Sequence, residues 1–295
     1  IYQKGVPYRY NATQSVVIPN IEGLHYIYFN NGILSVTESF TVDMIKKYVF
    51  VATVQWDATN SKHIMLGDER HGLVMDGDTH AYLHAAVGTR YISGLSAGDF
   101  TLSGDGSLDS QAELSISDGS ISDEDIGISV SNSASPSSPF QQILSPISHI
   151  PIYYRSGTVG NWRKNNATAF PVKAGTSRIQ FNKYDGTTWS TVDASSDNNY
   201  IAVWVFATNN QEEPIVGVLG QLESTTLTDA QSNNLYQSIS FGNLPSLEMK
   251  ILYRLIYKTN STYSNTVKAV LADITDLRRA VDVSLGTYAP GDHGC

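Results

Sequence analysis

Apolar runs rich in β-branched and aromatic residues, bounded by turn-forming residues, recur throughout this sequence. Two runs extend from Tyr48 to Trp56 and from Tyr200 to Thr208, and a third, "EMKILYRLIYKT", alternates strongly between the two faces of a strand. The tripeptides "NNG" and "YDG" are hairpin-turn signals. We therefore predict a mostly β fold, built largely from antiparallel strands, with only short helices.

The chain also aligns with itself at an offset of 151 to 155 residues. The paired landmarks are Asn11 with Asn166, Pro19 with Pro171, Phe29 with Phe181, Tyr48 with Tyr200, and Gly67 with Gly220. The same order of landmarks in both halves predicts two tandem-duplicated β-rich units. The alternative is that two unrelated β-rich stretches share turn residues.

Each unit is expected to contain a short first strand, several longer strands and a helix. The short strands are expected at Ser15–Ile18 and Ala169–Val172. The helices are expected at Ala81–Ala86, capped by Asp78 or Thr79, and at Asp229–Ser238, capped by Thr226 or Thr228. Two closing strands, joined through "NSTYSN", are expected after the second unit.

The stretch between the units differs in composition. It has no Lys or Arg from Tyr91 to Tyr154, and its acidic residues alternate with apolar ones and Gly-Asp turns. This pattern predicts an antiparallel β insertion with one solvated face. Calcium binding by its Asp-rich turns is a functional alternative, although no spacing matches an EF-hand loop. The predicted division is residues 1–90, the first repeat; 91–150, the acidic insertion; 151–245, the second repeat; and 246–295, closing strands and the start of a fibre segment.

Charge and cysteine content exclude several classes of function. The formal net charge of −9 argues against nucleic acid as the main partner, because phosphate contacts need clustered Lys and Arg. Membrane insertion is not expected, because no apolar run approaches the length of a membrane helix. The only cysteine, Cys295, permits neither an internal disulfide nor a thiolate zinc cluster.

The densest group of candidate ligands is "DERHGLVMDGDTHAYLH", which holds three histidines and four acidic residues in seventeen positions. His80 and His84 are four residues apart, so a helix would place both rings on one face, a geometry that metals use. The candidate metal ligands are His71, Asp76, His80 and His84, with Asp68 as an alternative carboxylate.

Polar scaffolding and catalysis are the other interpretations of this group. A bare H-x-x-x-H is common, and the motif lacks the glutamate of the H-E-x-x-H proteases. In the second unit, His80 aligns with Ser232 and His84 with Tyr236, so the repeated fold itself does not require the imidazoles. There is no G-x-S-x-G elbow and no P-loop. We predict a protein without enzymatic activity and without a cofactor, except for a divalent metal at this group.

Several of these stretches resemble structural proteins of tailed-bacteriophage particles. They are "LGDERHGLVMDGDTHAYLHAAVGTRY", "IPIYYRSGTVGNWRKNNATAFPV" and "FGNLPSLEMKILYRLIYKTNSTYSNTVKAVLADITDLRR". The terminal "PGDHGC" is similar to the opening of a tail-fibre repeat, from which we expect fibre sequence beyond Cys295 and a longer parent polypeptide.

The resemblance implies a β-rich, low-cysteine module of a tail fibre, head fibre or baseplate appendage, located in the virion and assembled as a homotrimer with other virion proteins. The expected function is structural, in support of host attachment. The alternatives are a module that binds a host glycan or receptor, a capsid decoration or baseplate protein, and a metal-dependent hydrolase that uses the histidine group.

Overall fold

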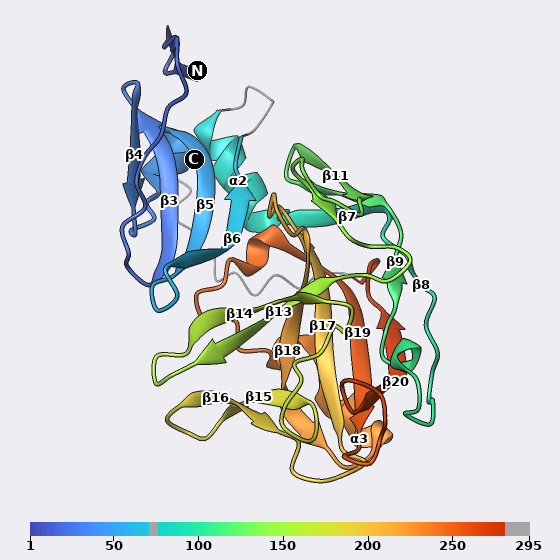
Figure 1. Cartoon of the computed structure of the whole chain (residues 1–295). Helices are drawn as coiled ribbons and strands as arrows, with labels where there is room; N and C mark the ends of the chain where they lie inside the picture. The colour runs from blue at the N-terminus through green and yellow to red at the C-terminus, as the bar shows by residue number, and fades with distance from the viewer. Residues whose placement is uncertain (71–75, 281–295) are drawn as a thin grey trace.

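The fold is mostly β, as the sequence predicts, with 46% of residues in strands and 10% in helices. The structure is a computed structural model, and it describes residues 1–70 and 76–280 (Figure 1). Figure 1 shows the blue N-terminal sheet at one end of the molecule and the yellow-to-red C-terminal sheet at the other. No helix in the described ranges is long and apolar enough to cross a bilayer.

The N-terminal sheet has four antiparallel strands in the order β4-β3-β5-β6. Their bounds are β3 Gly23–Asn30, β4 Ile33–Thr37, β5 Val49–Asp57 and β6 Lys62–Asp68. The predicted hairpin turn joins β3 to β4 through Asn31 and Gly32. Their φ angles are 48° and 78°, and a two-residue type I′ turn requires a positive φ at both positions. A small hairpin, β1 Tyr2–Gln3 and β2 Val6–Pro7, precedes the sheet.

Helix α1, Val42–Lys46, packs against this sheet, and helix α2, Gly77–Ala86, packs against α1. Helix α1 connects β4 to β5, and α2 follows β6. The helix predicted at Ala81–Ala86 is therefore present, but the prediction of its start was wrong. The helix begins four residues earlier, because the Asp76 carboxylate accepts hydrogen bonds from the backbone N–H groups of Asp78 and Thr79.

The acidic insertion forms the β sheet that its alternating pattern predicts, in the order β12-β11-β10-β7. The bounds are β7 Thr89–Gly94, β10 Gly119–Asp123, β11 Ile126–Asn132 and β12 Gln141–Gln142; β12 is parallel to β11 and the other pairs are antiparallel. Two further short strands, β8 Ala97–Gly98 and β9 Ser115–Ile116, pair beside it, and the 3-10 helix η1 spans Asp109–Gln111.

The C-terminal sheet has six strands in the order β14-β13-β18-β17-β19-β20. The bounds are β13 Ile150–Ser156, β14 Asn161–Thr168, β17 Tyr200–Thr208, β18 Ile215–Ser224, β19 Met249–Thr259 and β20 Ala269–Asp276. Only the β13–β18 pair is parallel. The closing strands β19 and β20 pair antiparallel, as predicted.

The remaining elements of this half are a separate hairpin and three short helical segments. The hairpin is β15 Gln180–Tyr184 with β16 Trp189–Asp193. The helical segments are α3 Leu227–Asn233, η2 Tyr236–Ser238 and η3 Ser246–Glu248. Thr226, one of the two predicted caps, caps α3, but the helix begins two residues before the predicted Asp229 and ends five residues before the predicted Ser238.

One apolar core spans the predicted boundary at residue 150. Ile121 and Ile128 of the insertion pack in the same buried cluster as Val203 and Leu255 of the C-terminal sheet. A second cluster, on Trp162, Trp204 and Phe206, includes Ile64 from β6. The insertion and both sheets therefore share packing, because neither short insertion sheet could bury its apolar face alone.

The two predicted repeats share a strand hairpin followed by a helix: β5–β6–α2 and β17–β18–α3. They differ in the preceding hairpin, because β3–β4 pairs with β5 whereas β15–β16 forms its own two-stranded sheet. Tandem duplication therefore stays a prediction. The short strands predicted at Ser15–Ile18 and Ala169–Val172 were wrong, since neither stretch pairs with a sheet. The first is followed by Pro19 and the second contains Pro171, and proline has no N–H to donate.

Candidate functional site

A cluster of buried carboxylates lies where the N-terminal sheet, the insertion and the C-terminal sheet meet. Glu69 follows β6, Asp123 ends β10, and Glu248 ends η3. One carboxylate oxygen from each lies within 4.8 Å of the others, and all three side chains are buried. We call Glu69, Asp123 and Glu248 the acidic centre.

Backbone pairing between the two sheets brings this centre together. The N–H of Asp68 donates to the carbonyl oxygen of Asn209 (3.2 Å), and Gly67 forms an isolated antiparallel bridge with Asn210. A Cβ atom on Gly67 would lie 2.4 Å from Thr53 Oγ1 and 2.7 Å from Asn209 Oδ1. A glycine at position 67 therefore allows the two sheets to approach closely at the centre.

The side-chain amide of Asn209 points into the acidic centre. Its Nδ2 lies 2.9 Å from Asp123 Oδ2, 3.2 Å from Glu248 Oε2 and 3.3 Å from Glu69 Oε1. It is also 3.5 Å from the carbonyl oxygen of Asp68. The Oδ1 atom of the same amide is buried and has no hydrogen-bond partner among the described residues.

Burial and mutual repulsion shift the pKa values of the carboxyl groups in the acidic centre. Burial raises the pKa of Glu69 well above its ordinary value, and the charges of Asp123 and Glu124 raise it further. Burial likewise raises the pKa of Glu248, followed by the charges of Asp123 and Glu69. Asp123 is held in place by the Thr89 hydroxyl, which donates to its Oδ1 (2.9 Å). Burial and repulsion therefore favour the protonated forms of Glu69 and Glu248, and a nearby cation would be needed for all three carboxyl groups to ionise together.

The two histidines of helix α2 face a fourth acid beside this centre. His84 Nδ1 lies 2.8 Å from Glu124 Oε1 and 3.6 Å from Glu248 Oε1, and His80 Nε2 lies 3.3 Å from Glu124 Oε2. Burial alone would raise the pKa of Glu124, but the hydrogen bonds from His80 and His84 outweigh it and lower this pKa to about 2. The histidines thus stabilise the Glu124 carboxylate.

The predicted metal ligands are only partly brought together. His80 and His84 converge on Glu124, as helical spacing predicts. Asp76 is exposed and caps α2 with both carboxylate oxygens, which accept hydrogen bonds from Thr79 as well as Asp78. Asp68 pairs with Arg70. His71 lies outside the described residues.

Sequence reasoning missed most of the acidic centre. Asp123 belongs to the acidic insertion that was singled out, and Glu69 lies within the histidine-rich stretch. No sequence motif marks Asn209 or Glu248 as a site residue. Each lies beside a long apolar strand and contacts residues that are far away in the sequence. Only the fold shows that these four side chains meet.

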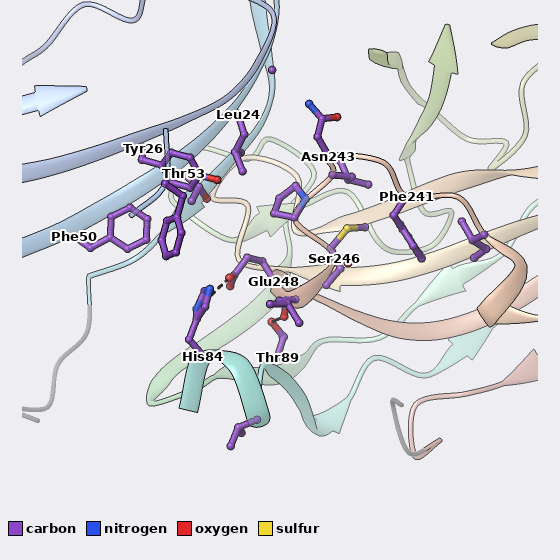
Figure 2. A pocket seen from close by; sticks show the side chains of 18 of the residues that line it. Leu24, Tyr26, Phe50, Thr53, His84, Thr89, Phe241, Asn243, Ser246 and Glu248 are labelled. Carbon is purple, nitrogen blue, oxygen red and sulfur yellow. Dashed lines mark hydrogen bonds and ion pairs between the residues drawn. The ribbon is translucent and has the colours of Figure 1, made fainter. Parts of the chain in front are cut away.

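A pocket of about 810 Å³ opens beside the acidic centre. Figure 2 shows Tyr26 and Phe50 on the wall from the N-terminal sheet, Phe241 on the opposite wall, and His84 beside Glu248 between them. Thr53 and Thr89, which contact the acidic centre, also line the pocket. The pocket combines aromatic surfaces with one polar edge, an arrangement suited to small-molecule binding.

Comparisons with known proteins identified no relative. No family model matches the chain, and neither the curated proteins nor the solved structures gave a match. The function must therefore be argued from the chemistry of the chain itself.

Proposed function

We propose that this protein is a non-enzymatic structural module of a tailed-bacteriophage appendage, which assembles as a homotrimer through its N-terminal region and supports host attachment. The proposal joins the sequence resemblance to one structural observation: apolar side chains are exposed at the N-terminal end. Half of the exposed large apolar side chains of the described residues lie in the first 42 positions. They are Ile1, Tyr2, Val6, Val17, Ile21, Ile33, Phe40 and Val42.

The backbone of the same region also has unused hydrogen-bonding capacity. Residues 9–18 run without regular structure, and in the described ranges they make no backbone-to-backbone hydrogen bond. Among the strands that the structure describes, β4 pairs only with β3 and forms the outer edge of its sheet. Open strand edges with apolar side chains pair readily with other chains.

Exposed apolar surface of this kind favours association. Val17 is 86% exposed and Ile33 is 67% exposed, so covering them removes apolar area from water. Permanent assemblies typically bury about 2,000 Å² or more. Three identical chains related by a threefold axis would each present the same region to a neighbour. The unpaired backbone groups of all three chains could then form hydrogen bonds between chains.

The experiment is light scattering with size-exclusion chromatography on the wild type and on the double variant Val17→Asp/Ile33→Lys. We expect three chains for the wild type and a smaller species for the variant, because each substitution places a charge in the proposed interface. The matched control is Val159→Asp, since Val159 is 75% exposed but lies on the β13–β14 turn. A monomeric wild type, or a variant that assembles normally, would overturn the proposal.

A second candidate function is binding of a host glycan, which the pocket favours. Aromatic rings offer apolar faces to sugars, and tyrosine adds a polar group. If this is correct, soluble host-surface oligosaccharides will bind the wild type in a glycan array, and Phe50→Ala will lose that binding. Absence of any glycan signal for the assembled wild type would eliminate this candidate.

A further inference from the structure

The acidic centre gathers three buried carboxyl groups whose joint ionisation is unfavourable without a cation. Glu69, Asp123 and Glu248 are 1%, 2% and 4% exposed, so water screens them poorly. The charged groups that most strongly raise the pKa values of Glu69 and Glu248 are other carboxylates. Buried charges of one sign are normally paired or coordinate a metal.

The amide of Asn209 is an independent indication of a ligand at this place. Its Nδ2 has two hydrogens but lies 2.9–3.5 Å from four oxygen atoms. Its Oδ1, in contrast, is buried without a hydrogen-bond partner in the described part of the chain, and the whole residue is 0% exposed. Unsatisfied buried polar atoms are rare in folded proteins and call for an explanation.

A bound cation explains both features. The two orientations of an asparagine amide have nearly the same shape, and the choice between them follows from the surrounding hydrogen bonds. Rotating the Asn209 amide by half a turn brings its oxygen among the three carboxylates. That orientation is repulsive without a cation and favourable with one, because the amide oxygen then becomes a ligand.

We propose that Glu69, Asp123, Glu248 and Asn209 form a binding site for a divalent cation that prefers oxygen ligands, of the calcium, magnesium or manganese class. All four supply oxygen atoms, the donor set that these cations prefer, whereas zinc sites usually include histidine or cysteine. The histidines are left out of the ligand set because Glu124 is, among the described residues, the nearest carboxylate to both, and His84 Nδ1 lies farther, at 3.6 Å, from Glu248 Oε1.

The position of the site gives the cation a structural role. Its ligands come from the end of the N-terminal sheet, the insertion and the C-terminal sheet. One ion would therefore join three segments that are distant in sequence. Glu248 also lines the 810 Å³ pocket, which provides a route for the ion from solvent. This site is independent of the proposed assembly, because none of its ligands lies in the first 42 residues.

The test uses the full chain after treatment with a chelator and dialysis. Thermal unfolding is followed with CaCl2, MgCl2, MnCl2 or ZnCl2 added separately, and bound metal is counted by mass spectrometry of the elements. We expect one ion per chain and a rise in Tm of about 5 °C or more at a hundredfold excess over Kd with at least one of the first three salts. No response to these three, or a response to zinc alone, would overturn the proposal.

Isosteric variants distinguish a cation site from a merely structural cluster. Glu248→Gln removes one charge at nearly constant shape, so we expect an unchanged or higher Tm without metal and loss of the cation-dependent rise. Asp123→Asn should lose the same rise. The matched control is Glu213→Gln, which breaks the ion pair with Lys164. This variant should keep the cation-dependent rise in Tm. A full cation response in Glu248→Gln would contradict the assignment, whether or not Asp123→Asn folds.

Discussion

The two large sheets of this protein differ most in how completely they are covered. In the C-terminal sheet, every residue of β17 after Tyr200 is buried, whereas no residue of β4 in the N-terminal sheet is buried. The C-terminal sheet has the insertion packed on one face, and on the other Ile64, Leu244 and Phe241 pack against its aromatic side chains. A central strand covered on both faces stabilises the fold, while a sheet with an exposed edge leaves surface for partners.

The largest expected effect comes from a cavity in the better-covered sheet. Phe206 is 0% exposed and packs edge-on against Phe241, so Phe206→Ala should lower the free energy of unfolding by about 3–5 kcal/mol. The matched variant in the N-terminal sheet is Phe29→Ala, whose ring contacts Tyr10 on the irregular segment. Urea unfolding should show a smaller loss for Phe29→Ala, because that segment can move into the space. Equal losses would contradict the comparison.

A smaller effect is expected where the two sheets are joined. The Tyr153 hydroxyl donates to the carbonyl oxygen of Ile64 (2.5 Å), and burial raises the pKa of this phenol well above its ordinary value. Tyr153→Phe leaves that carbonyl without its buried donor and should cost about 1–3 kcal/mol by the same urea measurement. Tyr184→Phe is the control, because its hydrogen bond to Gly186 is exposed, and it should cost no more than about 0.5 kcal/mol.

The smallest effect concerns the cap of α2 and also tests the metal ligands predicted from sequence. Asp76→Ala removes three hydrogen bonds to Asp78 and Thr79 and should cost about 1 kcal/mol, measured by thermal unfolding. Thr226→Ala, which removes the cap of α3, should cost a similar amount. Asp76→Asn keeps a capping oxygen, so it should retain stability and the cation response. Loss of that response in Asp76→Asn would instead favour the ligand set predicted from sequence.

Much of the fold was predictable because its signals are local. The length and alternation of β17 and β19, and the Asn31-Gly32 turn, depend on neighbouring residues alone. The start of α2 was not predicted, because "DGDT" offers three possible capping residues and the sequence alone does not rank them. The strand predicted at Ser15–Ile18 was wrong for another reason: the apolar run is followed by Pro19, which has no N–H to donate to a sheet.

The candidate site was only half predictable. The spacing of His80 and His84 correctly places both rings on one side of a helix, but nothing in the sequence identifies their partner, Glu124, which lies 40 residues after His84. Asn209 joins the acidic centre through the backbone pairing of β6 with residues 209 and 210, and Glu248 comes beside it because Met249 of β19 pairs with Thr208 of β17. Such long-range contacts depend on how the sheets dock, which local patterns do not encode.

The most direct test of the uncovered N-terminal region is hydrogen–deuterium exchange on the wild-type protein. Within residues 1–70 and 76–280, the amides of residues 9–18 make no backbone-to-backbone hydrogen bond, so slowed exchange there would indicate pairing with another chain. We predict that exchange in residues 9–18 and in β4 is slowed at least about tenfold relative to free peptides, and that Val17→Asp/Ile33→Lys abolishes this protection. Exchange of residues 9–18 at the free-peptide rate in the wild type would contradict the account.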